Sequence, residues 1–403
     1  MTVQTTSNLS NSIRAQYIAD YIRGAMLPRL YDQFSTPIGG ISMAQAMQGS
    51  SVVIPFLYDL EPATTAISET ADITPVVMTD GSTSVSVTSR DNAIQWSEKL
   101  DLTAYTNYGA ERFYKLGQNQ MESIELLAMQ ECLEGSLVNR AAARASLNAC
   151  TSGHRLSDAD VEDVQAEMAS LRVPAFAGTG GAQSWAMLLH PYPFHDLRES
   201  GNIDSVGIYQ NQGIALNWEL GKLGPFRLIV NADAKTLYGA GIARTAGSLS
   251  EALATAVAAG AKTTVLTTGT HVDDSLWINF LDGVETSTTF YPKNEHARYV
   301  SGTLTNTITF VGTAEDGGLR FAHAATTTTV NNSDDVFPVV YGGPQSLVKL
   351  YAPEVGEFGE VVGPEEGGLL HQFRHIGWKW YGGYARFAEN RIIRGEYPVS
   401  FQG

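Results

Sequence analysis

The feature that most restricts how this chain can fold lies between residues 74 and 88. Thr74–Met78 and Ser84–Thr88 have strand-like sequences, and Asp80-Gly81 between them is a strong signal for a hairpin turn. Val85 and Val87 alternate with small polar residues, as in a strand with one covered face. A two-stranded ribbon is marginally stable in water, so we expect a neighbouring subunit to supply the surface on which this one lies. The residues expected in that contact, at the tip of the hairpin, are Val77, Asp80, Gly81, Val85 and Val87.

Helical patterns lie on both sides of this hairpin. The start of the chain is polar and predicts a loose arm, followed by a stripe of apolar residues at helical spacing between residues 13 and 26. Residues 52–56 predict a short strand before the hairpin. The longest helical pattern covers residues 109–147, and Gly117 and Gly135 weaken it without ending it. We therefore expect one long helix that acts as a strut.

Helices and strands are mixed in the middle of the chain. Ser157 and Asp160 have the spacing of a capping box, so a helix is predicted to begin there and to end before Pro174. Trp185–Leu189 predicts a buried strand, and Leu223–Val230 predicts another. This mixture indicates an α+β unit.

Residues 236–335 differ from the rest because they are rich in Ala and Thr. Turn clusters such as Glu315–Gly318 and Asn331–Asp335 separate short strand-like stretches, which favours a small β-rich insertion. The predicted strands of this insertion are Thr263–Leu266, Ser275–Leu281, Thr303–Val311 and Thr326–Val330. Two further strands are expected between Gly377 and Tyr397.

Length and charge narrow the class of protein. The 403 residues exceed the ~250–300 at which single cores stop growing, so we expect more than one folding unit. A net charge of −16 opposes binding to phosphate backbones, so nucleic acid would be enclosed and not bound. Cys132 and Cys150 do not make a disulfide framework, which indicates a reducing compartment. The N-terminus lacks a signal-peptide pattern, and no apolar run approaches the ~18 residues of a membrane span.

No enzymatic motif is visible in the sequence. It contains no P-loop, dinucleotide fingerprint or nucleophile elbow. His371 and His375 have the spacing of zinc ligands on a helix, but no Glu stands where a metalloprotease carries its base, and Arg374 would oppose a cation. We therefore expect no catalytic residue, no cofactor and no metal site.

An aromatic cluster near the C-terminus has two interpretations. Trp378, Trp380, Tyr381, Tyr384 and Phe387 could form a platform for a sugar or a base, because both stack on aromatic faces. Alternation along a strand puts Trp378 and Trp380 on the same face, as in a packed sheet. Packing in a core or an interface is the favoured interpretation.

The order of these parts resembles the major capsid proteins of tailed phages, which share the HK97-type fold. An arm, an unsupported hairpin, a strut helix, an α+β unit and a returning C-terminal strand follow one another as in that family. Short motifs make the chain similar to the N4-like branch in particular. These motifs are Tyr31-Asp-Gln-Phe34, Thr64-Thr-Ala-Ile-Ser-Glu69, His190-Pro191, Ile376-Gly-Trp-Lys-Trp380 and Ile392-Ile-Arg394. The resemblance covers roughly residues 1–235 and 336–403 and leaves the Ala/Thr-rich segment as an inserted domain.

The resemblance implies a domain organisation, in which the hairpin reaches a neighbouring subunit and the long helix is the spine of a peripheral domain. Trp378, Trp380, Tyr381 and Tyr384 would pack in that peripheral domain. The implied parts are an N-terminal arm with a helix (1–50), an extended hairpin loop (51–103), the spine helix of the peripheral domain (104–150), an axial domain (151–235), a β-rich insertion domain (236–335), and a return through the axial domain to peripheral-domain strands (336–403).

The resemblance also implies a structural function and no enzymatic activity. Copies of the chain would form hexamers and pentamers that close an icosahedral head around phage double-stranded DNA. Portal and scaffolding proteins would be partners, a decoration protein would be an optional one, and no membrane would be involved. Assembly would take place in the bacterial cytoplasm and the product would be the virion. The alternatives are another β-rich virion or surface-layer protein, and a carbohydrate-binding or hydrolytic protein that uses the aromatic C-terminus.

Overall fold

The structure is a computed structural model of the chain, which divides into two units. Unit 1 comprises Met1–Ala128 and Leu347–Phe387, and unit 2 comprises Met129–Ser346 and Ala388–Gly403. The predicted N-terminal arm and, apart from Tyr21, the helix predicted after it lie outside the described residues. The structure describes residues 21, 30–37, 51–64, 75–103, 109–141, 146–151, 153–177, 183–199, 204–205, 219–242, 249–268, 277–286, 288–302, 306–352, 356, 359–367 and 373–400.

Unit 1 is built on one long strand, β20 (Phe373–Arg386), in a five-stranded sheet. β20 pairs antiparallel with β4, β18 and β19, and β1 pairs parallel with β18. The bounds of these strands are β1 (Ser35–Pro37), β4 (Thr88–Ser97), β18 (Leu347–Tyr351) and β19 (Glu360–Gly367). Ile376, Trp378 and Trp380 are buried at every second position of β20, which is the alternation that the sequence predicts.

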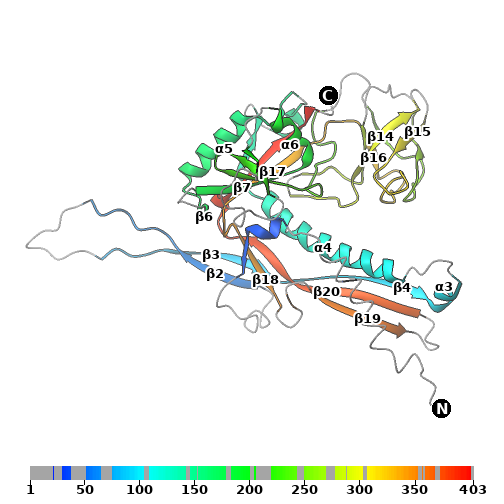
Figure 1. Ribbon diagram of the computed structural model, residues 1–403, viewed down its shortest axis with the longest axis horizontal. Coiled ribbons are helices and arrows are strands. Elements are labelled where there is room, and N and C mark those ends of the chain that lie inside the picture. The colour runs from blue at the N-terminus through cyan, green and yellow to red at the C-terminus, as the bar shows by residue number, and fades with distance from the viewer. Residues whose placement is uncertain are drawn as a thin grey trace, which may run out of the picture. The chain divides into compact units, whose positions relative to one another are not determined.

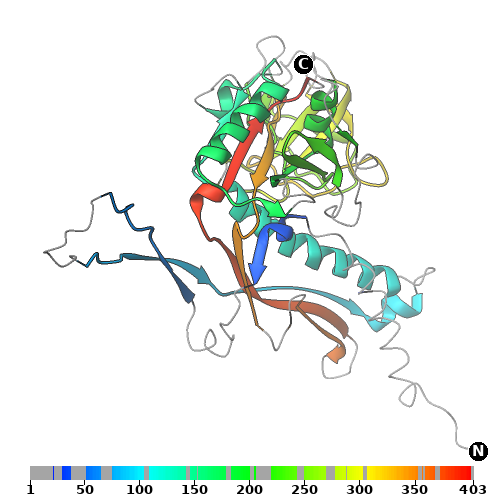
Figure 2. The same cartoon turned by 60° about the vertical axis from the view of Figure 1, so that its left-hand side comes forward.

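Helix α4 (Gly109–Leu133) follows the short helix α3 (Glu98–Thr103) and runs alongside β4 and β20 (Figure 1; Figure 2). Phe113 of α4 meets Trp96 of β4 edge-on, with ring centroids 6.3 Å apart. On the same side of the sheet, Trp378 Nε1 donates a hydrogen bond to Oδ1 of Asn119 at 3.3 Å. The buried face of β20 is therefore covered by α4.

The helix predicted over residues 109–147 is wrong in its C-terminal part. α4 ends at Leu133, and Val138–Arg140 forms strand β5 instead. At this end of the helix the guanidinium of Arg394 donates to the carbonyl oxygens of Leu133 and Gly135, and β5 pairs with β21 just beyond it. A cation satisfies carbonyl groups that have no partner inside the helix and complements the helix dipole. Because Arg394 lies 261 residues after Leu133, the local pattern did not reveal it.

Strands β2 (Ser51–Leu57) and β3 (Asp80–Ser86) form a separate antiparallel ribbon that pairs along its whole length. The predicted turn at Asp80-Gly81 is therefore wrong, and the partner of β3 is β2 and not Thr74–Met78. Gly81 lies opposite Phe56, and a Cβ atom at Gly81 would lie 2.8 Å from the Cζ atom of that ring. The glycine makes room for an aromatic ring across the strand pair, which is a different use from a turn.

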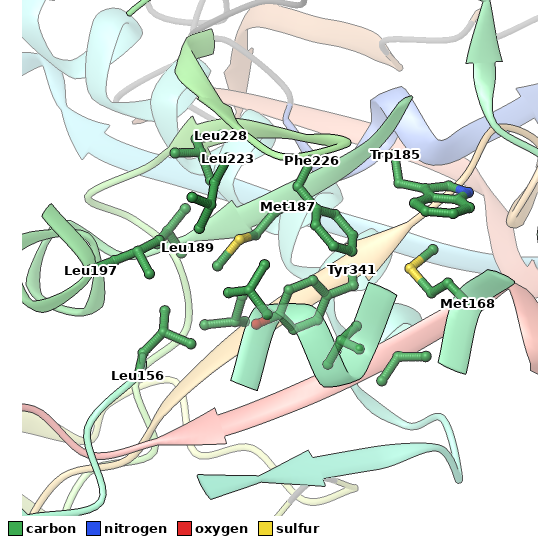
Figure 3. Close-up of a cluster of buried hydrophobic side chains, with 14 of the residues drawn as sticks. Leu156, Met168, Trp185, Met187, Leu189, Leu197, Leu223, Phe226, Leu228 and Tyr341 are labelled. Atoms are coloured by element: carbon green, nitrogen blue, oxygen red, sulfur yellow. The ribbon is translucent and has the colours of Figure 1, made fainter. Parts of the chain in front are cut away.

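Unit 2 contains an eight-stranded sheet with the order β5-β21-β17-β7-β10-β9-β8 and with β6 beside β7. Its further strands are β6 (Phe176–Ala177), β7 (Gln183–Leu189), β8 (Asp204–Ser205), β9 (Glu219–Leu223), β10 (Phe226–Val230), β17 (Phe337–Gly342) and β21 (Ile392–Tyr397). Helices α5 (Asp158–Ser170) and α6 (Pro191–Arg198) contribute Met168 and Leu197 to the apolar cluster around Met187 (Figure 3).

Two local predictions in this sheet have different outcomes. The backbone N–H of Ser157 donates to the carboxylate of Asp160 at 2.9 Å, so the predicted capping box of α5 is confirmed. The strand predicted at Leu223–Val230 is confirmed over Phe226–Val230, which is β10, but Leu223 ends the preceding strand β9 and the two form a hairpin. Gly224 has a φ of 57°, and this left-handed conformation, which glycine adopts readily, turns the chain between the two strands.

The β-rich segment predicted at 236–335 forms a second sheet in unit 2, with the order β11-β16-β13-β14-β15-β12. A bridge between Leu253 and Leu266 joins the first strand to the last, and Ala254 N donates to Val265 O at 2.9 Å beside it. The sheet therefore closes into a six-stranded barrel. Its strands are β11 (Ser250–Ala252), β12 (Thr263–Val265), β13 (Trp277–Leu281), β14 (Glu295–Ser301), β15 (Thr307–Val311) and β16 (Thr329–Asn331).

The barrel has its own apolar core, in which Phe280 and Phe310 meet edge-on with ring centroids 5.0 Å apart. β11 and β14 are strands that the sequence analysis did not predict. The chain enters and leaves the segment at neighbouring positions, because Leu237 and Val336 form a backbone bridge. This pairing brings the two ends of the segment together, as an inserted domain requires.

Candidate functional site

The β2–β3 ribbon has two chemically different faces. On the covered face, Val52 lies opposite Val85 and Ile54 opposite Thr83. On the outer face, apolar side chains of β2 alternate with the covered ones, and Leu57 is 64% exposed. The residues of β3 on this outer face are serines and one aspartate. The ribbon therefore presents a narrow apolar stripe that its own unit does not cover.

The base of the ribbon is anchored to the sheet of unit 1 (Figure 1). Val85 is fully buried in a cluster that includes Val348 of β18 and Ala385 of β20. Phe56 of β2 meets Phe387 edge-on, with ring centroids 6.2 Å apart. These contacts run along the covered face from Val85, near one end of the paired strands, to Phe56, near the other, while the outer face and the segments beyond the strands lie outside this cluster.

The segments that continue beyond the paired strands, residues 58–64 and 75–79, form what we call the ribbon tip (Figure 1). Backbone pairing extends one step into it, where Tyr58 N donates to Thr79 O at 3.1 Å. Val77 is 85% exposed. The other exposed large apolar residues of the tip are Tyr58, Leu60, Val76 and Met78. Apolar side chains gathered on an exposed surface mark a site of interaction with another molecule.

The structure places the five residues predicted at the hairpin tip in different parts of unit 1. Val77 lies in the ribbon tip, but Asp80 and Gly81 begin β3. Val85 is buried in its own unit, so it is not available to a neighbouring subunit. Val87 is half-buried and packs against the same cluster as Val85. Sequence reasoning placed the turn too late in the chain because it paired β3 with the wrong segment.

The aromatic residues near the C-terminus all lie on β20 or directly after it. Trp378, Trp380 and Tyr384 are buried, and the rings of Trp380 and Tyr384 stack with centroids 6.2 Å apart. Tyr381 differs from the prediction because its side chain is 38% exposed on the opposite face of the strand. With both tryptophans inside unit 1, this segment has no exposed indole platform for a sugar or a base.

A buried charged group that the sequence analysis missed lies in the 3-10 turn η1 (Tyr31–Phe34). Asp32 accepts hydrogen bonds from Lys349 Nζ at 3.0 Å and from Tyr384 Oη at 2.9 Å. Glu125 of α4 accepts from the backbone N–H of Leu30 at 2.6 Å. Together they fix this segment to the sheet and to α4. The available signal was the lysine inside the apolar strand β18, since a buried ammonium needs a counterion.

The described histidines His190 and His375 each make a local contact. His375 Nε2 lies 3.6 Å from Glu365 Oε2 on the neighbouring strand, and His371 lies outside the described residues. His190 caps α6 by accepting the backbone N–H of Tyr192 at 3.2 Å, and its burial lowers its pKa to about 4. In the part of the chain that the structure describes, no group of three or more His, Cys, Asp or Glu side chains could hold a metal ion. None of the described helices is long and apolar enough to cross a membrane.

No family model matches the sequence, and no curated protein matches it either. Solved structures do match. The capsid of Ralstonia phage GP4 has a TM-score of 0.52 at 10% identity, covering 87% of this chain and 84% of that chain. The capsid of cyanophage P-SCSP1u has a TM-score of 0.51 at 9% identity, covering 93% of this chain and 89% of that chain. This chain has the fold of a phage capsid protein.

The capsid fold includes both units, since neither unit alone amounts to the 93% of the chain that is matched. The α+β fold of HK97 type that the sequence predicts is thereby confirmed. At 9–10% identity the likeness concerns the fold, and it assigns no role to individual side chains. The role of the ribbon tip has to be argued from its own geometry.

Proposed function

We propose that this chain is the major capsid protein of a tailed phage. Many copies form hexamers and pentamers that close an icosahedral head around double-stranded DNA. The observation that carries the proposal is the capsid fold, which includes both units. The ribbon tip with its exposed apolar side chains supports it. A chain that remained monomeric would expose the apolar side chains of this tip to water, which is unfavourable.

The occupant proposed for the outer part of the ribbon is a second copy of the chain. Burying one valine or leucine stabilises a contact by about 1.5–3 kcal/mol, and the tip and the outer face together offer several such residues. Each contact can stay modest, because a subunit in a shell is held by several neighbours at once.

The remaining partners are proposed from the net charge and from the resemblance to tailed-phage capsid proteins. The net charge of −16 disfavours tight binding of DNA, so the shell acts as a wall around the genome. Scaffolding and portal proteins guide assembly in the bacterial cytoplasm, and a decoration protein is an optional further partner. The chain resides in the virion, contacts no membrane and catalyses no reaction.

The two alternatives are less well supported. A surface-layer or other virion protein would also expose apolar contacts, but it would form open sheets or fibres. A carbohydrate-binding or hydrolytic protein would need an accessible aromatic platform, and Trp378 and Trp380 are buried instead.

We also propose placement in the N4-like branch, on the motifs quoted from the sequence. Two of them have structural roles that are compatible with a family signature. Asp32 of the Tyr31–Phe34 motif is bound by Lys349, and the segment from Ile376 to Trp380 supplies buried residues of β20. Superposition of a solved N4-like capsid that places unrelated residues at Asp32 and Lys349 would contradict the placement.

The test is a chain in which residues 59–78 are replaced by Asn-Gly, so that Tyr58 and Thr79 are joined by a two-residue hairpin turn. This variant removes most of the tip and keeps all of β2 and β3. Wild type and variant are each expressed alone and with the scaffolding protein, then examined by electron microscopy and sedimentation. We expect closed shells from the wild type and folded, unassembled subunits from the variant.

Circular dichroism and hydrogen exchange of β20 serve as the control for folding of the variant. Shells of normal size from the variant would refute the role of the ribbon tip. Persistent wild-type monomers in the presence of scaffolding protein would count against the capsid function itself.

A further inference from the structure

A buried histidine lies at one end of the barrel, between two carboxylates. His323 is 2% exposed, and its ring stacks on Phe280 with centroids 5.5 Å apart. Its Nδ1 lies 3.0 Å from Oδ1 of Asp282, and its Nε2 lies 3.1 Å from Oε1 of Glu295. A neutral imidazole carries one N–H and would leave its other nitrogen facing an acceptor. Only the imidazolium can donate to both carboxylates.

His323 belongs to a segment, residues 319–328, that we call the strap. The strap is bound to the rest of the barrel by backbone hydrogen bonds to residues between Leu253 and Ala261, two of them at His323 itself, and by the same carboxylate. Glu295 of β14 accepts the backbone N–H of Arg320 and of Phe321, each at 2.8 Å. The Glu295 side chain therefore connects three strap residues, and one of these three bonds depends on a proton that can leave near neutral pH.

The strap has a strained backbone close to this histidine. Thr326 has a φ of 64°, in the left-handed region that β-branched residues rarely adopt. It is held there by neighbouring bonds, since Thr326 N donates to Leu253 O at 2.9 Å and Thr328 Oγ1 donates to Asp282 Oδ1 at 2.6 Å. Such strain persists only where the surrounding contacts enforce it.

The charged groups around His323 set the direction of its titration. Burial alone lowers the pKa of His323, but the hydrogen bonds to Glu295 and Asp282 outweigh it and raise the pKa above its ordinary value. The other titratable neighbours are Lys293, which helps to lower the pKa of Asp282, and His296 and Tyr238, on whose pKa values the charge of Glu295 acts. A raised pKa in the folded state means that the stabilisation is complete below the unfolded value of about 6.5 and is lost as the pH rises through the folded value.

We propose that His323 acts as a pH-dependent latch on the barrel. As an imidazolium it bridges Asp282 and Glu295 and holds the strained strap closed. When it loses its proton, one of the two bridging bonds is lost and the strap opens more often, while the barrel strands stay paired. The proposal concerns the fold of the barrel and does not depend on the assembly of a shell.

Hydrogen exchange of the full unassembled chain tests the latch between pH 5.5 and 9. Protection factors, which correct for the intrinsic effect of pH on exchange, are compared for the strap and for β14 and β15. We expect strap protection to fall with rising pH above about 6.5, by up to about tenfold per pH unit. Protection of β14 and β15 should change much less.

Two variants separate the latch from general effects of pH. His323→Gln should show low strap protection at every pH, whereas His195→Gln, a change at an exposed histidine of α6, should keep the wild-type profile. Wild-type strap protection that does not vary with pH, or a pH dependence that persists in His323→Gln, would overturn the proposal.

A third variant keeps the test decisive if His323→Gln does not fold. Asp282→Asn removes one of the two carboxylates that raise the pKa of His323. The loss of strap protection should then occur at lower pH than in the wild type. An unshifted midpoint would also overturn the proposal.

Discussion

The ribbon and the barrel are both made of short antiparallel strands rich in Ser and Thr, yet they differ in whether they are complete. The barrel joins its first and last strands through Leu253 and Leu266 and encloses Phe280 in its core. The ribbon has two strands, is covered at its base, and exposes Leu57 and Val77. The barrel satisfies its edges within itself, whereas the outer part of the ribbon leaves apolar surface for another molecule to cover.

The two regions have similar compositions, so composition does not explain this difference. Closure of the barrel explains it. An edge strand presents unpaired backbone groups that invite another chain, and a barrel removes its edges by pairing them. The free energy gained by burying the apolar side chains of the barrel already stabilises its own fold. The apolar side chains of the ribbon outer face and tip remain available for association, so the same strand chemistry forms a stable insertion in one place and the proposed contact in the other.

The largest effect is expected from deleting an aromatic ring from the core of the sheet that anchors the ribbon or from the core of the barrel. Trp380→Ala and Phe280→Ala each remove a fully buried aromatic side chain, which costs about 3–5 kcal/mol. We expect Trp380→Ala to lower hydrogen-exchange protection in β4 and β18, and Phe280→Ala to lower it in the barrel strands. Each variant therefore serves as the control for the other. Equal loss of protection in both regions from either variant would show that they do not fold as separate cores.

A smaller effect is expected at the ion pair that fixes η1 to the sheet of unit 1. The side chains of Lys349 and Asp32 are 2% and 11% exposed, so Lys349→Met removes the bound cation from a largely covered carboxylate. Removing one member of a buried pair is expected to lower the free energy of unfolding by about 3 kcal/mol. Denaturant titration measures the loss, and adding Asp32→Asn should recover part of it. A double variant no more stable than Lys349→Met alone would contradict this account of the pair.

The smallest effect on stability is expected at the ribbon tip, where the comparison is sharpest. Val77→Asp and Val284→Asp change the same residue type at strongly exposed sites in the ribbon tip and near the barrel, with exposures of 85% and 74%. Both should alter the free energy of unfolding by less than about 0.5 kcal/mol.

Assembly separates the two valine variants. Val77→Asp would place a charge in the proposed contact and should reduce the yield of shells in sedimentation, while Val284→Asp should not. Equal yields from the two variants would mean that the tip residue Val77 is not buried between subunits.

Much of the local structure could be predicted because local patterns carry it. The alternation of Trp378 and Trp380 favoured one packed face for this strand, and both side chains are buried on β20. Ser157 and Asp160 marked the start of α5, because a capping box involves only residues that are three apart. The order of the arm, hairpin, long helix, α+β unit and C-terminal strand resembles that of tailed-phage capsid proteins, and the capsid fold was predicted from that resemblance.

The candidate site was predicted only in outline. A ribbon in need of support was expected, and Val77 lies in its exposed part, while its contact with a neighbouring subunit stays a prediction. The turn was misplaced because Asp80-Gly81 has the local signature of a hairpin, while the partner strand β2 lies more than twenty residues earlier. Gly81 leaves room for the ring of Phe56, and a packing requirement of that kind leaves no distinct signal in the sequence.

By itself, then, the sequence determined which residues favour helix or strand and which faces are apolar, because these depend on neighbours within a few positions. The tertiary structure alone decided which strands pair and which charges meet. Arg394 ends α4, Lys349 finds Asp32, and Leu253 closes the barrel with Leu266. These contacts join distant parts of the chain, and they form only when the whole unit has folded around them. The β2–β3 ribbon illustrates both kinds of information. Its strand character follows from the local sequence, whereas its pairing and its exposed tip depend on the tertiary structure.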